Sequence, residues 1–291
     1  MSLLFQELTP HLWAAQCRRY AMNTGILQDG GHAALIDPGL LPDEVEDIAA
    51  FCAQRQWAVE TIVITHHHWD HVLGAARFPG ARIVTHQAYL AESALELEHT
   101  RSAIRRFYGE EGVATPAPFE PPLPDQTVDR IVGLMVGDMR VQLFHTPGHA
   151  RDHLSLYDPD STFLWAGDLV SDLEIPFVSD RLDAFERTLA MFAAMEIHLL
   201  IPGHGTVTRD AADIRHRIDD DRAYLAALRS RIEPVVHSGG SVQDAVAACA
   251  DMTFRNPDAN AGPHLMNVEQ VFLECGGPAP PTTLLGWARE L

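Results

Sequence analysis

A histidine-rich segment directly after an apolar run constrains this chain more than any other feature. Residues 61–64 read Thr-Ile-Val-Ile, and residues 65–71 continue as Thr-His-His-His-Trp-Asp-His. A β-strand sends alternate side chains to opposite faces, so His66 and His68 should point the same way as the chain leaves the strand, with Asp70 and His71 following in the turn. Neutral imidazole and carboxylate are ligands that zinc, iron(II) and manganese(II) accept. The segment therefore predicts a metal site at the end of a strand.

Three downstream segments repeat this arrangement. Each is a short apolar run that ends at a turn with Gly or Pro, and a metal-binding side chain stands at each turn: His149, Asp168 and His204. Open α/β folds place their functional sites at the carboxyl ends of strands. The three segments therefore offer the ligands that the first segment lacks.

The ordered pattern resembles the metallo-β-lactamase superfamily. His-x-His-x-Asp-His at residues 66–71 is followed by Thr-Pro-Gly-His at 146–149, Gly-Asp at 167–168 and Pro-Gly-His-Gly at 202–205. Asn23 and the Asp-Pro-Gly of residues 37–39 also match the opening strands of that family. The resemblance covers roughly residues 1 to 210, and its combined motifs are highly specific.

This resemblance implies two metal ions that share one ligand. The implied ligands are His66, His68 and His149 for the first ion, Asp70, His71 and His204 for the second, and Asp168 as the bridge. Two ions about 3.5–4 Å apart need an anionic ligand between them. A hydroxide bridging the pair would act as nucleophile, because such metals lower the pKa of bound water toward ~7. Asp70 is also expected to accept the proton of this hydroxide. Zinc is the expected metal, with iron or manganese as alternatives.

Other side chains around the motifs receive weaker assignments. His67 occupies the variable position of the first motif and is expected to face outward, whereas Trp69 is expected to form a wall of the site. His145 and His153 flank the Thr-Pro-Gly-His turn. We interpret both as structural histidines, with orientation of a ligand by hydrogen bonding, or proton donation, as the alternative.

Composition bears on partners and compartment. The formal net charge is −19, from 40 acidic and 21 basic residues, and we expect no nucleic-acid partner because such binding depends on basic residues that neutralise phosphates. No run approaches the ~20 apolar residues of a membrane span, and the first residues lack the pattern of a signal peptide. Four widely spaced cysteines suit a reducing compartment. We expect a cytoplasmic protein with a small-molecule substrate and no membrane partner, in an oligomeric state that the sequence leaves open.

The pattern of apolar residues predicts an α/β fold. Strands are expected at residues 59–64, 81–85, 140–144, 162–165 and 198–201, and helices at 44–55, 183–195, 213–232, from 241, and 263–274. The resemblance implies the αββα four-layer sandwich of the family with a C-terminal helical extension. We expect residues 1–210 to form the catalytic domain, residues 86–130 to be an insertion or lid within it, and residues 211–291 to form a helical cap. Both additions are expected to set specificity, with 263–274 packed near the mouth of the metal cleft.

Asp168 separates the branches of the family. Members that resemble true β-lactamases generally lack a bridging aspartate, whereas members that resemble glyoxalase II and lactonases keep it. Residues 205–208, after His204, lack the basic and aromatic residues that grip glutathione in glyoxalase II. We therefore predict a dinuclear metal-dependent hydrolase of a small ester, lactone or thioester. A phosphodiesterase or endoribonuclease with the same site, a mono-iron persulfide dioxygenase, and a metal-binding protein without catalysis remain as alternatives.

Overall fold

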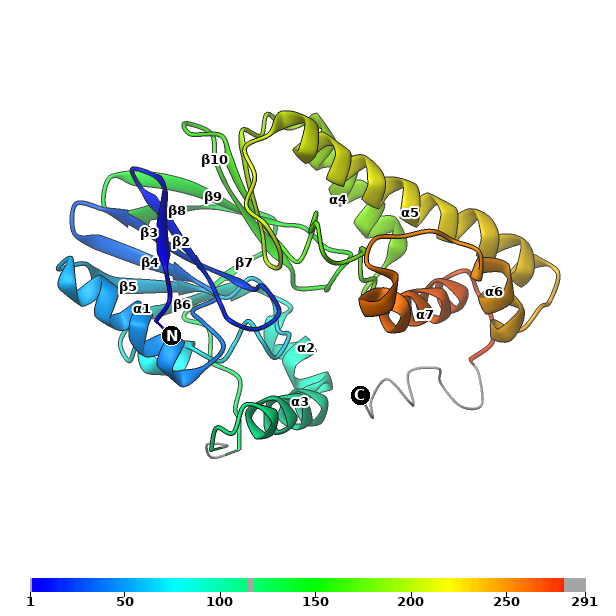
Figure 1. Cartoon of the computed structure of the whole chain (residues 1–291), viewed down its shortest axis with the longest axis horizontal. Helices are drawn as coiled ribbons and strands as arrows, with labels where there is room; N and C mark the ends of the chain where they lie inside the picture. Colours follow the sequence, from blue (N-terminus) through cyan, green and yellow to red (C-terminus); the bar gives the residue numbers. More distant parts are fainter. Residues whose placement is uncertain (1, 115–117, 280–291) are drawn as a thin grey trace.

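Two β-sheets lie face to face in the structure, a computed structural model that describes residues 2–114 and 118–279 (Figure 1). The first sheet holds β1 (Phe5–Thr9), β2 (Leu12–Gln16), β3 (Asn23–Asp29), β4 (His32–Ile36), β5 (Ala58–Val63), β6 (Arg82–His86) and β7 (Gln126–Val128), side by side in chain order. The second sheet holds β8 (Ile131–Val136), β9 (Met139–His145), β10 (Leu154–Asp158), β11 (Phe163–Gly167) and β12 (Leu199–Pro202). The five strands expected from the sequence are β5, β6, β9, β11 and β12.

Strands near the site are buried on both faces, which explains their continuous apolar runs. In β5, Val63 packs between the sheets while its neighbour Ile62 faces outward against a helix. In β11, Trp165 fills the space between the sheets and Leu164 faces the other way. The Trp165 ring lies so close to Gly25 that a Cβ atom there would come within 2.7 Å of it. A glycine in β3 therefore permits the contact between the two sheets.

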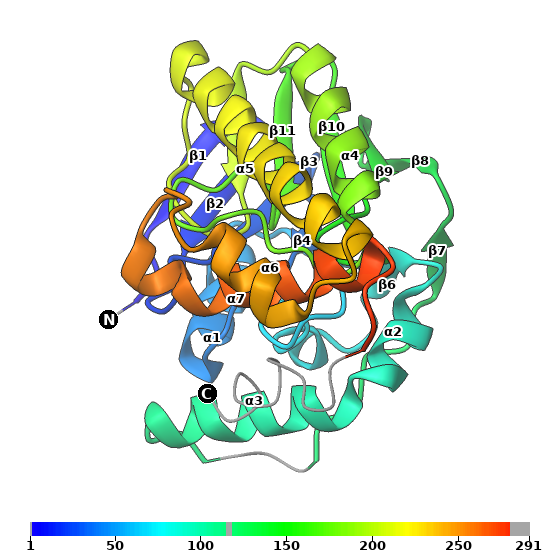
Figure 2. The same ribbon diagram turned by 90° about the vertical axis from the view of Figure 1, so that its right-hand side faces the viewer.

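Helices cover both outer faces of the paired sheets. The helix α1 (Pro42–Gln54) packs on the first sheet, and Glu44 in its first turn accepts the N–H of Leu41 at 3.0 Å. The helices α4 (Leu182–Ala194) and α5 (Ala211–His237) cover the second sheet (Figure 2). The four layers confirm the expected αββα sandwich.

Between β12 and residue 279, the last described residue, the chain forms three helices, as expected. Beyond α5, α6 (Val242–Cys249) begins with a capping box: Asp244 accepts the backbone N–H of Ser241 at 2.8 Å, and the Ser241 hydroxyl accepts that of Asp244 at 3.2 Å. The helix α7 (Pro257–Glu274) begins at Pro257 rather than at residue 263, because Pro257 takes the first-turn position that suits proline and Pro263 is accommodated within the helix. Its buried face joins the cluster of apolar side chains around α4 and α5.

Residues 86–130 contain both helices and a strand of the first sheet. The helices α2 (Tyr89–Leu95) and α3 (Leu97–Glu110) follow β6, and β7 then returns the chain to the first sheet, where it pairs with β6. A short 3₁₀ helix, η1 (Ala75–Arg77), lies before β6 in the chain. Residues 115–124 are rich in proline; of these, 115–117 lie outside the described residues, and 118–124 contain neither helix nor strand. Within the described part of the chain, no helix combines the length and apolarity that a membrane span needs.

The start of β3 is tied to the end of β12. The N–H of Asn23 donates to the Gly203 carbonyl at 2.7 Å, and its side-chain amide donates to the carbonyls of Pro202 at 2.8 Å and Gly205 at 2.9 Å. These bonds hold the first sheet against the loop that carries His204.

Candidate metal centre

The carboxyl ends of four strands bring the predicted ligands together at one edge of the sandwich. The loop after β5 carries the ligands of residues 66–71, and His149, Asp168 and His204 follow β9, β11 and β12. One carboxylate oxygen, Asp168 Oδ2, lies at the centre. It is 3.5 Å from Nε2 of His66, His149 and His204, and 3.2 Å from Nε2 of His71.

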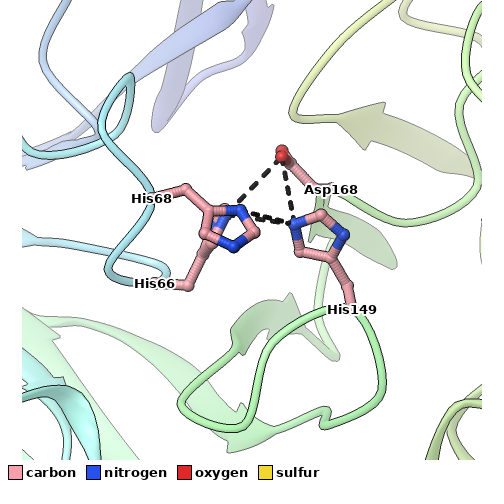
Figure 3. Close-up of side chains that lie close together, drawn as sticks. All are labelled: His66, His68, His149 and Asp168. Carbon is pink, nitrogen blue, oxygen red and sulfur yellow. Dashed lines mark hydrogen bonds and ion pairs between the residues drawn. The ribbon is translucent and has the colours of Figure 1, made fainter. Parts of the chain in front are cut away.

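Three imidazoles converge on one side of Asp168 (Figure 3). His149 Nε2 lies 3.2 Å from His66 Nε2 and 3.0 Å from His68 Nδ1. We call His66, His68 and His149 the three-histidine group. All three ring nitrogens and the Asp168 carboxylate lie close enough together to hold one ion.

A carboxylate and two imidazoles gather on the other side of Asp168. Asp70 Oδ2 is 3.2 Å from His204 Nε2 and 3.7 Å from His71 Nε2. We call Asp70, His71 and His204 the aspartate group. These three side chains are buried and are also close enough to hold an ion together.

Hydrogen bonds outside the cluster orient most of these imidazoles. The Nδ1 atom of His71 lies 2.9 Å from Asp37 Oδ2, that of His149 lies 3.1 Å from the Phe177 carbonyl, and that of His204 lies 3.0 Å from the Tyr20 carbonyl. Each partner accepts a proton on Nδ1, which turns the Nε2 lone pair toward the cluster.

The two groups differ in protonation. Burial lowers the pKa of His66 and His68 far below the ordinary value and that of His149 to about 3. Burial also acts to lower the pKa of His71 and His204, but nearby carboxylates outweigh it and raise both pKa values well above the ordinary value. The largest carboxylate effects come from Asp168 at His71 and from Glu174 at His204.

The donor set fits divalent metal ions. Among the described residues, the buried Asp168 Oδ1 atom has no hydrogen-bond partner. Buried polar atoms in proteins are normally hydrogen-bonded, so such atoms need another explanation. Converging imidazole nitrogens and carboxylate oxygens are the ligand atoms that divalent metal ions accept.

Comparison with known proteins agrees with this arrangement. A family model described as the metallo-beta-lactamase superfamily matches residues 18–220. The chain belongs to this superfamily. The model spans all seven predicted ligands, and the resemblance noted in the sequence is confirmed.

Two curated relatives and one solved structure illustrate the likeness. Hydroxyacylglutathione hydrolase of Acidiphilium cryptum (strain JF-5) is 28% identical over 220 residues, covering 74% of this chain and 76% of that protein. Atrochrysone carboxyl ACP thioesterase of Aspergillus chevalieri is 26% identical over 231 residues, and the match spans 77% of this chain and 66% of that protein. A crystal structure of a metallo-beta-lactamase family protein from Thermus thermophilus superposes with a TM-score of 0.70 at 22% identity, covering 94% of this chain and 98% of that one. The structural likeness shows the fold.

His67, at the variable position of the superfamily motif, is buried, so the expectation that it faces outward is wrong. Its Nδ1 lies 2.8 Å from Asp152 Oδ1 and its Nε2 lies 3.6 Å from Glu96 Oε2. Burial acts to lower the pKa of His67, but these two carboxylates outweigh it and raise the value to about 9. The His67 ring, which we expected at the surface, is thus held inside the protein by an ion pair.

The two histidines beside the Thr-Pro-Gly-His turn of the superfamily differ in their contacts. His153 Nε2 accepts the backbone N–H of Asp168 at 3.1 Å, and its Nδ1 lies 2.7 Å from Thr146 Oγ1. Burial lowers the pKa of His153 to about 3, which keeps the ring neutral as an acceptor. The ring of His145 instead stacks on His86 at 3.9 Å between centroids. Of the two, only His153 touches a predicted ligand.

Three residues near the site received no role from the sequence. Asp37 bonds His71 and also accepts the N–H of Thr65 at 2.9 Å. Glu174 Oε1 lies 4.0 Å from His204 Nδ1, on a side chain that is 45% exposed. Tyr20 supplies the carbonyl that His204 bonds. Only Asp37 carried a signal, since its Asp-Pro-Gly turn matches the superfamily at a strand end.

Proposed function

We propose that this chain is a dinuclear metal-dependent hydrolase that cleaves a small thioester, ester or lactone. One observation carries the proposal: Asp168 Oδ2 lies within 3.5 Å of imidazole nitrogens from both the three-histidine group and the aspartate group. A carboxylate in that position suits the ligand that two ions share.

The two groups would hold one ion each, and Asp168 would bind both. Zinc is the metal we propose, with iron or manganese as alternatives. Such ions supply a nucleophile at neutral pH and stabilise the negative charge that develops on the acyl oxygen during attack.

The chain's own residues prepare the site. Burial keeps the three-histidine group neutral and able to donate lone pairs. Asp70, beside His204 at 3.2 Å, is placed to accept the proton that the attacking water releases. Asp37 and the carbonyls of Phe177 and Tyr20 fix the ring orientations, so little reorganisation is needed when the substrate binds.

Thioesters are the first substrate class to test. The two curated relatives are, by name, a hydroxyacylglutathione hydrolase and an ACP thioesterase. At 28% and 26% identity these names guide the choice of substrates for this chain and do not fix one.

The decisive experiment combines metal analysis of untagged protein with a panel of thioesters, lactones and phosphodiesters. We expect two ions per chain and acyl-ester or thioester turnover that a chelator abolishes and added metal restores. The exposed His198 provides a control, since His198→Ala should retain both. One iron per chain with oxygen uptake would instead favour the dioxygenase, and phosphodiester turnover that falls steeply with salt would favour the nuclease. Cell fractionation tests the cytoplasmic location that we propose with this function.

A further inference from the structure

Three aromatic rings from distant parts of the chain meet beside the aspartate group. Tyr20 comes from the turn between β2 and β3, Trp69 from the ligand loop and Phe107 from α3. The ring centroids lie 5.7 Å apart for Tyr20 and Trp69, 5.0 Å for Trp69 and Phe107, and 5.8 Å for Tyr20 and Phe107. We call these three rings the aromatic cluster. Such spacings are typical of interacting aromatic pairs.

Two residues of the aromatic cluster are connected to predicted ligands, Trp69 through the chain and Tyr20 through its backbone. Trp69 stands between the predicted ligands His68 and Asp70 in the sequence. Tyr20 presents its carbonyl to His204 Nδ1 at 3.0 Å, and the next carbonyl, of Ala21, accepts the N–H of Gly205 at 3.0 Å. These two connections place the aromatic cluster next to the aspartate group.

Tyr20 adopts an unusual backbone conformation for its residue type. Its φ is +59° and that of Ala21 is +47°, so two consecutive residues with side chains are left-handed. This conformation is unfavourable for residues with a Cβ atom and favours Gly or Asn. The carbonyl contact with His204 needs only the backbone, so it does not explain why a large ring stands there.

The exposure of the rings gives a reason for an aromatic side chain at position 20. The side chain of Tyr20 is 48% exposed, whereas Phe107 is buried beneath it together with apolar residues such as Met22 and Ile104. Trp69 is partly buried and packs against the same cluster of side chains. Tyr20 and Trp69 thus keep part of their aromatic surface accessible above buried apolar side chains, and an accessible ring face can stack with a further flat group.

We propose that the aromatic cluster receives an aromatic, or similarly flat apolar, arm of the substrate, with Tyr20 as a specificity-determining residue. The inference rests on the proposed function, since it names the substrate class of that site. The arm belongs to the acyl side or the thiol side of a thioester, and both offer the same chemistry to the rings. One stacked aromatic pair changes affinity by about 3- to 10-fold.

The test compares Tyr20→Asn with Tyr20→Phe in the metal-loaded enzyme. Asn tolerates the left-handed backbone, so the carbonyl stays in place for His204 while the ring is removed. Three substrates are compared: phenylacetyl-N-acetylcysteamine, S-benzyl thioacetate, and acetyl-N-acetylcysteamine as the reference without a ring. Tyr20→Asn should lower the ratio of kcat/KM between one ring-bearing substrate and the reference about 3- to 10-fold, mainly through KM. Tyr20→Phe should keep the wild-type ratio.

The affected substrate identifies the side of the thioester that the rings receive. Unchanged ratios for both ring-bearing substrates in Tyr20→Asn would overturn the inference. If Tyr20→Asn loses metal, Trp69→Leu removes the second ring without altering the carbonyl on His204, and the same change in ratio is required of it. Leu95→Ala, at an exposed apolar residue of α2, is the control and should keep every ratio.

A binding measurement separates failure of this inference from failure of the proposed function. The thioether S-(2-phenylethyl)-N-acetylcysteamine cannot be hydrolysed, and its binding is followed by calorimetry and by tryptophan fluorescence. We expect Tyr20→Asn to weaken this binding about 3- to 10-fold relative to wild type. A wild-type enzyme that cleaves no thioester but shows this difference would overturn only the proposed function. Thioester cleavage without a difference in ratio or binding would overturn only the role of the aromatic cluster.

Discussion

The three-histidine group and the aspartate group are built from similar side chains, but the pKa values of their histidines are shifted in opposite directions. Burial lowers the pKa of every imidazole in the three-histidine group. In the aspartate group the same burial is outweighed by carboxylates, and the pKa values of His71 and His204 are raised. Burial alone therefore does not determine whether a histidine is free to bind a metal. At His71 and His204 the carboxylates close to the ring, chiefly Asp168 and Glu174 respectively, reverse its effect.

This difference implies unequal readiness for metal. A neutral imidazole accepts a cation at once, whereas a protonated one must first release its proton. The three-histidine group should therefore take up the first ion easily. In the proposed dinuclear site, the second ion would have to displace the proton that Asp168, Asp70 and Asp37 favour on His71.

Removing the shared carboxylate should have the largest effect, because Asp168 contacts both groups. We expect Asp168→Ala to lower turnover by about 10³-fold, the upper range for loss of one preorganised charge stabiliser. Elemental analysis should find fewer than two ions per chain. Asp138→Ala, at an exposed aspartate of the turn between β8 and β9, is the control. A single ion whose binding is the same with and without Asp168 would refute the dinuclear site.

Single histidine substitutions should separate the two groups. His149→Ala and His204→Ala should each reduce turnover by at least roughly 10²-fold. Metal titrations should show that His149→Ala weakens one ion and His204→Ala the other, since each belongs to a different group. Near-normal turnover in either variant, measured beside His198→Ala, would contradict the assignment of that histidine as a metal ligand.

The orientation of His71 offers a finer distinction. Asp37→Asn removes the charge that holds His71 Nδ1 at 2.9 Å, and Asn tolerates the left-handed φ of +44° at this position. Loss of such a partner typically weakens metal affinity about 10- to 100-fold. Calorimetric titration should place this loss on the second ion alone. An equal loss for both ions would mean that the groups are not independent.

The smallest expected effect is that of pH on metal affinity. Because the pKa values of His71 and His204 are raised, acid keeps them protonated and opposes binding of the second ion. Affinity for that ion should rise by about tenfold per pH unit between about pH 6 and 8 for each proton released. The three-histidine group is already neutral in this range and should vary less. Titrations of metal-free protein at three pH values measure both slopes, and equal slopes would contradict the comparison.

The parts of the fold that the sequence predicted are those with strong local patterns. Strands β5, β9, β11 and β12 combine apolar runs with a Gly, Pro or His-rich ending. By contrast, β7 has three residues and follows a Pro-rich stretch, so neither length nor composition marks it. Strand propensity depends on packing against neighbours, which a short edge segment acquires only in the folded protein.

The site shows the same division between local and distant information. The ligands could be predicted because each lies in its own motif. The burial of His67 could not, because its partner Asp152 lies 85 residues away. The contact of Asp37 with His71 spans 34 residues and has no local pattern beyond its turn.

The expected role of residues 263–274 in specificity stays a prediction, as does the division into lid, catalytic domain and cap. The structure shows that Asn267 of α7 accepts the N–H of Val178 at 2.7 Å and donates to the Pro176 carbonyl at 2.7 Å. Between them, the Phe177 carbonyl bonds His149. This helix therefore contacts the site through a core loop.

The bond between Asn23 and Gly205 has a consequence for biosynthesis. The two residues are 182 positions apart, and a ribosome that adds about 5–20 residues per second needs roughly 10–40 s to make the intervening chain. Strands β3 to β6 and the loop of residues 66–71 are made in the first part of that interval. An ion captured then would find ligands from one loop only, without His149, Asp168 or His204. The complete set of predicted ligands is thus available only after β12 and His204 have been made.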